Sequence, residues 1–385
     1  MLVAAEASGD ALGADLARAL KRQLGADHLR LVGVGGVRMA AEGVESPFDI
    51  AELSVLGIVE GLAAYPRVVR RADQTADLAV REQPDAAVLI DSWGFTLRVA
   101  QRLKRRLPAM PVVKYVAPQV WASRPGRAKT LAGTVDHLLA IHSFDAPYFE
   151  PHGLPVTFVG NPVLARDFAA ADGARLRQSL GYGPDDPILL VLPGSRGGEI
   201  KRVLPSFESA MLALVAQRPE LKVVVAAAET VADAVKQRAA AWPASIAVIE
   251  GEAARLDAMK AATVALACSG TVTTELALAG CPMVVGYRMG AVTYALIRPL
   301  ITAPYASLIN IAAGAEIAPE FIQSDCAAPA LAAALAQRLD DADLRRRQIA
   351  EQDAALEQMG RGCADPSETA AAAVIDMLRR AGAPA

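Results

Sequence analysis

The residues best suited to chemistry lie in a small polar turn, 268–271, between a short apolar segment and a predicted helix, 272–279. Ser269 or Thr271 can cap this helix, whose first N–H groups carry the positive end of the helix dipole and suit a phosphate. Glu275 lies one turn further on, where a carboxylate suits the two hydroxyls of a ribose. Because a second apolar strand follows, the stretch predicts a nucleotide–sugar site; the alternative is an ordinary βαβ unit whose small residues permit close packing.

A glycine-rich loop, 192–200, is the second candidate site. It follows the predicted strand 188–192, and open α/β sheets bind ligands at the carboxyl ends of their strands. No Gly-Lys-Ser/Thr sequence follows, so this is not a Walker loop. Arg196, beside Ser195, can form a forked hydrogen bond to a diphosphate and stabilise charge on a leaving group. The alternative is a glycine–serine turn with a solvated arginine.

If a nucleotide–sugar binds the second half of the chain, an acceptor would bind the first half. Asp91 ends an apolar run, 86–90, and a carboxylate at the mouth of a buried strand can accept a hydroxyl proton in the transition state. His142, an imidazole that titrates close to neutral pH in its unperturbed state, and Glu6 are the competing candidates. For each of them, a helix cap or a solvated loop residue is the alternative.

A cationic and apolar region lies in the first half of the chain. Nine basic residues and no acidic one occur between 92 and 135, and the apolar stretch Leu53–Pro66 precedes them. This combination is typical of contact with an anionic bilayer or a phosphate-bearing lipid. The residues expected to make that contact are Leu53, Val55, Leu56, Ile58, Val59, Leu62, Arg67, Arg70 and Arg71. Nucleic acid would need more interleaved aromatic residues, and the alternative is solvated basic helices over an apolar core.

Two series of alternating strand-like and helix-like segments predict an α/β fold with parallel sheets. Apolar strand candidates are 2–5, 29–34, 86–90, 112–116, 137–141 and 157–159, then 188–192, 222–226, 246–249, 264–267 and 283–285. The crossover is expected at Asn161–Pro162. The predicted domains are 1–160 and 161–365, with a last helix in 366–385 that returns to the first domain.

The bulk composition favours a globular chain with two cores. The 385 residues are 53% hydrophobic and 21% charged, and a net charge of −3 favours neither nucleic acid nor an acidic partner. The four cysteines form no Cys-x-x-Cys pair, so neither a disulfide frame nor a zinc site is expected. No signal peptide or sufficiently long apolar run is found, so we expect a cytoplasmic protein that is soluble or peripherally attached. The segment Gly33–Gly36 lacks the third glycine of a dinucleotide fingerprint, which disfavours an NAD oxidoreductase.

Together, the motifs resemble the lipid-A-disaccharide synthases over nearly the whole chain. The segments that carry the resemblance are 5–10, 33–36 with Met39, 53–60, 90–91, 115–122, 192–200, 269–289 and 307–310. The resemblance implies a GT-B fold, with two Rossmann-like domains facing a central cleft, a C-terminal helix on the N-terminal domain, and no metal or other cofactor. The alternatives are another GT-B enzyme that uses a UDP-amino sugar (a peptidoglycan-precursor transferase or an epimerase) and a binding protein without catalysis.

The reaction implied by the resemblance is an inverting sugar transfer. The 2,3-diacylglucosamine of a UDP donor would move to the 6-hydroxyl of 2,3-diacylglucosamine 1-phosphate, giving a β-1,6-linked disaccharide phosphate and UDP. Asp91 would be the base and Arg196 would stabilise the leaving group. The protein would act peripherally on the cytoplasmic face of the inner membrane, and its long alanine-rich tail makes a homodimer plausible.

The resemblance also assigns binding roles to individual residues. The diphosphate would be held by Arg196, Ser269, Gly270 and Thr271, and Ser195 would also contact the donor. Glu275 would bind the ribose, the backbone near Tyr287 and Arg288 the uracil, and Asn310 would help to close the donor site. The acceptor side would be lined by Glu6, Ser8 and Gly9.

Overall fold

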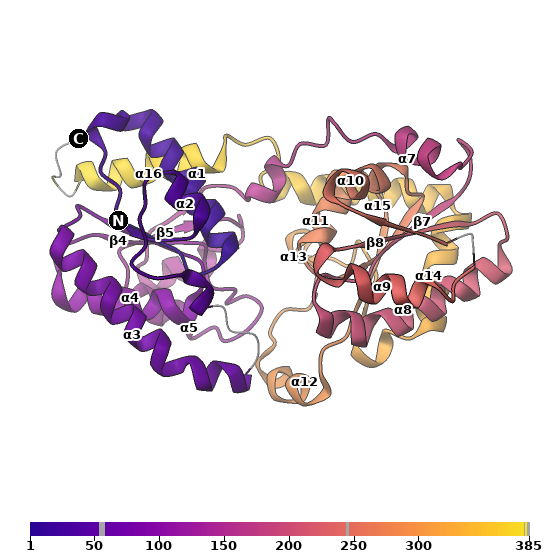
Figure 1. Ribbon diagram of the computed structural model, residues 1–385, viewed down its shortest axis with the longest axis horizontal. Helices are drawn as coiled ribbons and strands as arrows, with labels where there is room; N and C mark the ends of the chain where they lie inside the picture. Colours follow the sequence, from indigo (N-terminus) through magenta and orange to yellow (C-terminus); the bar gives the residue numbers. More distant parts are fainter. Residues whose placement is uncertain (54–57, 244–245, 381, 383–385) are drawn as a thin grey trace. The chain divides into compact units, whose positions relative to one another are not determined.

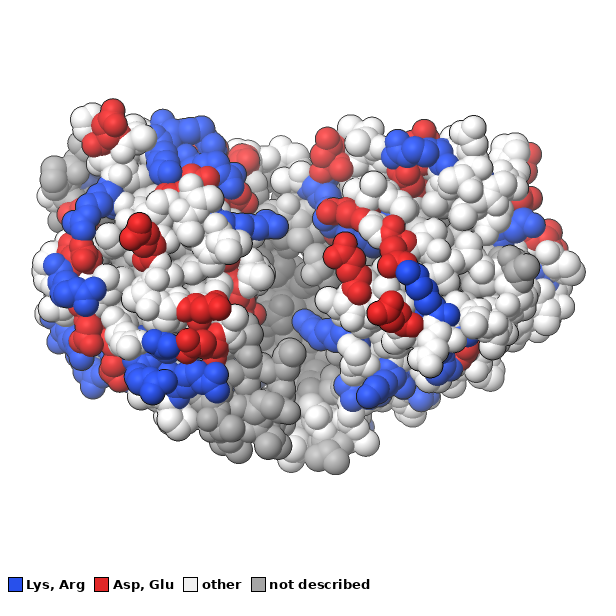
Figure 2. Space-filling model, in the orientation of Figure 1, with Lys and Arg blue, Asp and Glu red and all other residues white. Residues whose placement is uncertain are grey.

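The computed structural model describes residues 1–53, 58–243, 246–380 and 382, and for residues 58–64 and 292 it describes the backbone alone. The chain forms two compact units (Figure 1). Unit 1 comprises Met1–Pro162 and Gly362–Ala385, and unit 2 comprises Val163–Arg361. Charged side chains of both signs are spread over the face of each unit drawn in Figure 2, as the small net charge leads one to expect.

Unit 1 contains a parallel six-stranded sheet in the order β2-β1-β3-β4-β5-β6. Its strands are β1 (Leu2–Val3), β2 (Gly33–Val34), β3 (Ala87–Ile90), β4 (Val112–Tyr115), β5 (His137–Ala140) and β6 (Val156–Phe158). All four residues of β3 are buried. Parallel strands read as continuous apolar runs because helices cover both faces of the sheet.

The helices of unit 1 pack on the two faces through separate cores. They are α1 (Ala7–Leu24), α2 (Val37–Ala41), α3 (Ile58–Glu82), α4 (Trp93–Arg106), α5 (Arg127–Ala132), α6 (Ala146–Phe149) and α16 (Pro366–Arg380). Leu89 lies in one core with residues of α3, α4 and α5. Ile90, the next residue, lies in the other with residues of α1 and α16. This alternation follows from the two-residue period of a strand.

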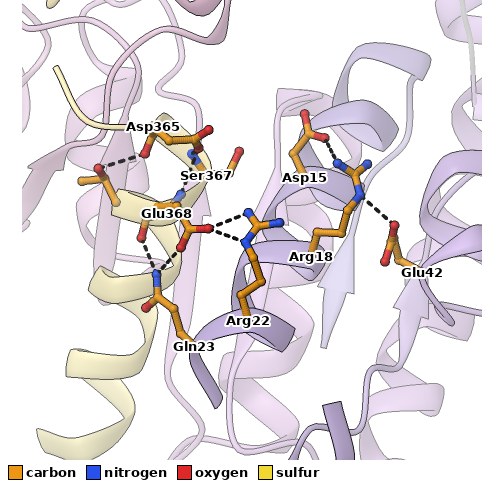
Figure 3. Close-up of polar contacts among 9 residues, drawn as sticks. Asp15, Arg18, Arg22, Gln23, Glu42, Asp365, Ser367 and Glu368 are labelled. Carbon is orange, nitrogen blue, oxygen red and sulfur yellow. Dashed lines mark hydrogen bonds and ion pairs between the residues drawn. The ribbon is translucent and has the colours of Figure 1, made fainter. Parts of the chain in front are cut away.

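The last helix, α16, belongs to unit 1, as expected from the sequence. Ala370, Val374 and Ile375 are buried in the core that α1 also enters. At the start of α16, Glu368 accepts a hydrogen bond from Arg22 at 2.6 Å and one from the Gln23 amide at 2.7 Å (Figure 3). These two contacts lower the pKa of Glu368. The end of the chain is thereby attached to its first helix by both apolar and polar contacts.

Unit 2 contains a second parallel six-stranded sheet, in the order β12-β11-β10-β7-β8-β9. The strands are β7 (Ile188–Leu192), β8 (Lys222–Ala227), β9 (Ile246–Glu250), β10 (Val264–Cys268), β11 (Met283–Tyr287) and β12 (Glu320–Ile322). The helices are α7 (Gly173–Leu180), α8 (Gly197–Gln217), α9 (Ala232–Ala239), α10 (Glu252–Ala261), α11 (Thr271–Leu278), α12 (Ala291–Ile297), α13 (Leu308–Ala313), α14 (Ala328–Asp340) and α15 (Ala342–Gln358). Again two cores, one on each face, hold the helices to the sheet.

In each sheet, successive strands of the chain are added first on one side of the initial strand and then on its other side. The change of side lies between β1 and β3 in unit 1 and between β7 and β10 in unit 2. The loops that leave two such neighbouring strands run to opposite faces of the sheet, which opens a crevice at the carboxyl ends of the strands. The two topological switch points therefore predict where each unit binds a ligand.

Candidate active site

The switch point of unit 2 contains a cavity of about 490 Å³. Its wall is formed by the loops after β7 and β10, together with residues that follow β8 and β9. The lining residues include Arg166, Gly194, Ser195, Arg196, Glu199, Arg255, Ser269, Gly270, Thr271 and Glu275. The glycine-rich loop and the polar turn, which the sequence places about 75 residues apart, thus lie on one cavity, because Leu192 and Ala267 are paired across the sheet.

The glycine-rich loop is held by Glu199, a residue that the sequence analysis did not single out. The Glu199 carboxylate is buried and accepts hydrogen bonds from the backbone N–H groups of Ser195 (3.2 Å) and Arg196 (3.3 Å). It also accepts one from the Arg196 guanidinium at 3.1 Å. The Arg196 side chain nevertheless remains 72% exposed, so most of its donors are free for a ligand. The signal that could have revealed Glu199 is its position three residues after the N-cap, as in a capping box.

The turn after β10 differs from expectation in one respect. The N-cap of α11 is Gly270, and no side chain caps this end of the helix, so the predicted capping by Ser269 or Thr271 is wrong. The Ser269 hydroxyl instead donates to the carbonyl of Ala306 at 3.0 Å, which fixes the turn to the segment before α13. The uncapped helix start faces the cavity, where an anion would meet the positive end of the dipole.

Glu275 lines the same cavity but already has two partners. It is 4% exposed and forms ion pairs with Arg166 and Arg255. Burial, with the nearby Arg166, lowers the pKa of Arg255. Sequence reasoning missed both arginines because neither belongs to a motif. The two guanidinium groups therefore fix the Glu275 carboxylate in position, and Arg166 also forms an ion pair with Glu252, which lines the same cavity.

Three expected donor residues lie outside the wall of this cavity. Tyr287 is half-buried at the end of β11, and Arg288 follows it. Asn310 is fully buried, and its amide donates to Ala318 and Glu320 and accepts from the backbone of Ile317 and Ala318. Its polar groups thus hold the backbone around α13. Any effect of Asn310 on a ligand would act through the segment that also receives the Ser269 hydrogen bond.

The switch point of unit 1 brings together the expected acceptor-side residues. The Ser8 hydroxyl lies 3.4 Å from Oδ2 of Asp91, and Glu6 precedes the same helix. A Cβ atom on Gly9 would lie 3.6 Å from the carbonyl oxygen of Ile90, so the small residue lets α1 approach the end of β3. Asp91 itself is partly exposed. A carboxylate with access to a ligand and a hydroxyl beside it are thus present in one unit.

The backbone at Asp91 has an unusual conformation. Asp91 and Ser92 both have positive φ angles, 50° and 39°, in the left-handed region that residues with side chains rarely occupy. The Asp91 N–H donates to the carbonyl of Tyr115 at 2.9 Å, and the Asp91 carbonyl accepts a hydrogen bond from the Thr96 hydroxyl at 2.8 Å. These contacts hold the turn that directs the Asp91 carboxylate.

Lys114, in the neighbouring strand β4, supports this turn. The residue pattern of the sequence did not reveal this role. Lys114 is 3% exposed, and its ammonium group donates to the Asp91 carbonyl and, at 2.9 Å, to the Thr96 hydroxyl. Burial lowers its pKa to about 7, although Asp91 and Glu6 act in the opposite direction. A lysine inside the predicted strand 112–116 was the available signal, because a buried cation requires partners.

The competing base, His142, lies in an aromatic environment. It is buried, stacks on Phe144 with the ring centres 5.0 Å apart, and meets the Trp121 ring edge-on at 6.1 Å. Burial lowers its pKa to about 4. Asp145, three residues further on, accepts a hydrogen bond from the Trp121 indole at 3.1 Å, and burial raises its pKa to about 7. The packing around His142 favours a role in the fold over proton transfer.

The expected lipid-contact residues divide into three groups. For Leu53 and Arg71 the expected lipid contact is wrong. Leu53 is buried in the core of unit 1. Arg71 forms an ion pair with Glu52, and its guanidinium carbon lies 4.7 Å from the centre of the Phe48 ring. Arg67 and Arg70 are exposed. Val55 and Leu56 lie outside the described residues, as do the side chains of Ile58, Val59 and Leu62. In the basic region, three residues of α4 pair with carboxylates, namely Arg102 with Asp73, Lys104 with Asp136 and Arg106 with Asp77.

In the part of the chain that the structure describes, no group of three or more His, Cys, Asp or Glu side chains could hold a metal ion. A membrane-spanning helix, long and apolar enough to cross a bilayer, is likewise not found among the described residues.

Comparison with known proteins identifies the family. A family profile described as lipid-A-disaccharide synthetase matches residues 1–374. The lipid-A-disaccharide synthase of Rhodospirillum centenum is 42% identical over 379 residues, covering 98% of this chain and 94% of the relative. The enzyme of the same name from Paramagnetospirillum magneticum is 41% identical over 381 residues, covering 98% and 97%.

Solved structures with a similar fold have much lower sequence identity. The glycotransferase of kitacinnamycin superposes with a TM-score of 0.61 at 16% identity, covering 99% of this chain and 98% of that one. S. aureus MnaA, solved with UDP, gives 0.59 at 13%, covering 98% and 95%. The UDP-GlcNAc 2-epimerase of Neisseria meningitidis gives 0.58 at 12%, covering 98% of both chains. These neighbours establish the fold, and the family match does not favour the epimerase alternative. The chain belongs to the lipid-A-disaccharide synthase family of GT-B glycosyltransferases.

Proposed function

We propose that this protein transfers 2,3-diacylglucosamine from its UDP donor to the 6-hydroxyl of 2,3-diacylglucosamine 1-phosphate, with inversion at the anomeric carbon. The products are the β-1,6-linked lipid A disaccharide 1-phosphate and UDP. The observation that carries the proposal is the unit 2 cavity, where the exposed Arg196 guanidinium and an uncapped helix start share one wall. That arrangement suits the diphosphate of a sugar nucleotide.

The donor would occupy unit 2. Arg196 and the turn Ser269–Gly270–Thr271 would bind the diphosphate, while Arg166 and Arg255 hold Glu275 in place. Glu275 would accept hydrogen bonds from the ribose hydroxyls, and the backbone near Tyr287 and Arg288 would contact the uracil. Charge that develops on the departing UDP would be stabilised by the Arg196 guanidinium and the N–H groups at the start of α11, so the proposed reaction uses no metal ion or other cofactor.

The acceptor would occupy unit 1, with Asp91 as the base. Its carboxylate would remove the proton from the attacking hydroxyl, and Ser8 at 3.4 Å would orient it. Inversion needs one in-line attack, so a single base and a stabilised leaving group suffice. Glu6 and Gly9 would line the acceptor site. Turnover requires the two units to present their substrates to each other.

Both substrates carry acyl chains, so the enzyme would work at the cytoplasmic face of the inner membrane as a peripheral protein. The exposed Arg67 and Arg70 on α3 would meet the anionic headgroups. A homodimer is compatible with this arrangement, and no nucleic acid is involved.

The test is an assay of the purified full-length chain with both acylated sugars, following UDP release and the mass of the product. We expect stoichiometric UDP and disaccharide phosphate, and at most trace turnover when UDP-N-acetylglucosamine without acyl chains replaces the donor. Efficient turnover of the donor without acyl chains would contradict the proposal in favour of a different UDP-amino-sugar enzyme. An Arg196→Ala variant should lose most UDP affinity, whereas Arg379→Ala, at the exposed end of α16, is the matched control.

A further inference from the structure

A carboxylate that does not line the unit 2 cavity holds a segment next to the turn 269–271, which we call the donor turn. Glu320, the first residue of the edge strand β12, accepts four hydrogen bonds through its two carboxylate oxygens. Its Oε2 accepts from the backbone N–H of Ala306 at 2.6 Å. Its Oε1 accepts from the backbone N–H of Ser307 at 2.8 Å, from the Ser307 hydroxyl at 2.6 Å and from the Asn310 amide at 2.8 Å.

The groups that donate to Glu320 are themselves fixed in the interior of unit 2. Ser307 is 1% exposed and Asn310 is fully buried, and the Asn310 amide also binds the backbone just before β12. Hydrogen bonds to an ionised group are roughly twice as strong as those between neutral groups. The Glu320 carboxylate therefore ties the segment that leads into α13 to the edge of the unit 2 sheet.

One further hydrogen bond connects this segment to the donor turn. The helices that the two segments begin, α11 and α13, lie side by side (Figure 1). The Ser269 hydroxyl donates to the Ala306 carbonyl at 3.0 Å, and the N–H of the same Ala306 is bound by Glu320. A hydroxyl has a single proton to donate. While it is bound to Ala306, Ser269 can therefore offer an anion only its backbone N–H, and its hydroxyl holds the turn.

We propose that Glu320 is a positioning residue of the donor site, which sets the donor turn through Ala306 and the Ser269 hydroxyl. The inference rests on the proposed function, because it takes the donor turn as the binding site of the UDP diphosphate. No side chain caps the start of α11, so the direction of its first N–H groups depends on where the turn is held. An N–H···O bond weakens steeply as its angle is lost, so a displaced turn binds the diphosphate less well.

Glu320→Gln is the direct test, with the Kd for UDP as the readout. Both carboxylate oxygens face N–H donors, so the amide nitrogen of glutamine meets a donor in either orientation. We expect the Kd for UDP to rise about ten-fold in this variant. Asp325→Asn is the matched control, because it removes an exposed carboxylate just beyond β12 and should leave the Kd unchanged.

Two double-mutant cycles separate positioning of the turn from a general loosening of unit 2. Ser269→Ala removes the hydroxyl that links the turn to Ala306, so in this background Glu320→Gln should raise the Kd no more than about two-fold. Thr230→Val removes a hydroxyl that donates to the Ser195 carbonyl at 2.6 Å and so holds the glycine-rich loop, the other loop of the cavity. In that background the effect of Glu320→Gln should remain about ten-fold, because the two links are independent.

Ser307→Ala keeps the test decisive if Glu320→Gln lowers the thermal midpoint of unfolding. This variant deletes one of the four hydrogen bonds and leaves the carboxylate in place. We expect it to raise the Kd for UDP about three-fold, and this effect should also disappear in the Ser269→Ala background.

Two results would overturn the inference. One is an unchanged Kd for UDP in both Glu320→Gln and Ser307→Ala. The other is an effect of Glu320→Gln that is equally large in the Ser269→Ala and Thr230→Val backgrounds, which would assign Glu320 to the fold of unit 2 alone. A parent protein that binds UDP but transfers no acylated sugar would refute the proposed function and leave this inference standing.

Discussion

At the residue scale, the feature that most constrains the mechanism is the support beneath Asp91. The carboxylate follows a backbone turn with two positive φ angles, and the Asp91 carbonyl is held by Lys114 and Thr96. A base must lie within hydrogen-bond reach of the proton it removes, and a displacement of about 1 Å can cost on the order of 10²-fold in rate. Lys114 is thus expected to act as a positioning residue.

Replacing Lys114 by Met tests this role. We expect kcat to fall about 10- to 100-fold with UDP affinity unchanged, because the donor cavity belongs to the other unit. Lys104→Met, which removes an α4 lysine paired with Asp136, is the control. Wild-type kcat in the Lys114 variant would refute the role.

Lys114 should also leave a signature in stability. Its pKa falls from 10.5 in the unfolded chain to about 7 in the folded one, so the unfolded chain binds more protons between these pH values. The residue's contribution to stability therefore increases as pH rises through that window, and it is least favourable below pH 7. Between pH 7 and 9, the unfolding free energy of the parent should rise relative to Lys114→Met by on the order of 2 kcal/mol. Urea titrations of both proteins at both pH values measure this difference. If the unfolding free energies of the parent and the variant change by the same amount between pH 7 and 9, the result contradicts a buried lysine with a lowered pKa.

At the element scale, the glycine-rich loop depends on one glycine for its shape. Gly194 has a φ of 110°, and a Cβ atom there would lie 2.7 Å from Oε2 of Glu199, the carboxylate that holds the loop. Gly197, three residues on, has open space at the corresponding position. We expect Gly194→Ala to weaken UDP binding at least ten-fold and Gly197→Ala to change it little. Isothermal titration calorimetry with UDP measures both affinities. Equal affinities of the two variants would show that the glycine-rich loop does not form part of the UDP site.

The return of α16 to unit 1 gives a second prediction at this scale. Ile375 is 6% exposed in the unit 1 core, so Ile375→Ala should cost about 2–4 kcal/mol of unfolding free energy. Glu368→Ala removes exposed polar contacts and should cost much less. In a Trp242→Phe background the remaining tryptophans, Trp93 and Trp121, lie in unit 1 and report its unfolding. Similar costs for both variants would mean that α16 is held by its polar contacts.

The sequence predicted most strands because buried parallel strands are continuous apolar runs, as β3, β7 and β10 are. It did not predict β12, whose three half-buried residues at the sheet edge include a glutamate. The apolar stretch 53–66 also did not reveal the extent of α3, which runs from Ile58 to Glu82 with Pro66 inside it. Local pattern cannot fix such boundaries, since tertiary packing continues the helix through a residue that usually ends one.

The sequence predicted those residues of the candidate site that belong to a recognisable motif. It did not predict residues that reach the site only because the fold brings distant parts of the chain together. Arg196 and the turn 269–271 could be found because the carboxyl ends of adjacent parallel strands converge. Arg166 and Arg255 come from other parts of unit 2, and only the fold shows that both pair with Glu275. The interior role of Asn310 was likewise invisible, because an amide that binds a ligand and one that binds backbone have the same sequence signature.

At the scale of the whole molecule, the two units repeat one architecture with different chemistry at the switch point. Unit 2 presents a guanidinium, an uncapped helix start and a cavity of about 490 Å³, and unit 1 presents carboxylates and a hydroxyl. This division matches a reaction in which one partner leaves as a diphosphate and the other loses a proton. Binding of UDP and catalysis should consequently be separable by mutation.

The most direct test of this division is Asp91→Asn, with sugar transfer and the Kd for UDP measured on the same preparation. Asparagine keeps the size of the side chain but cannot accept the proton. The account predicts a loss of about 10²–10⁴-fold in kcat with an unchanged Kd, the range expected for removal of a general base. Retained turnover, or a loss of UDP binding that parallels the loss of activity, would contradict it.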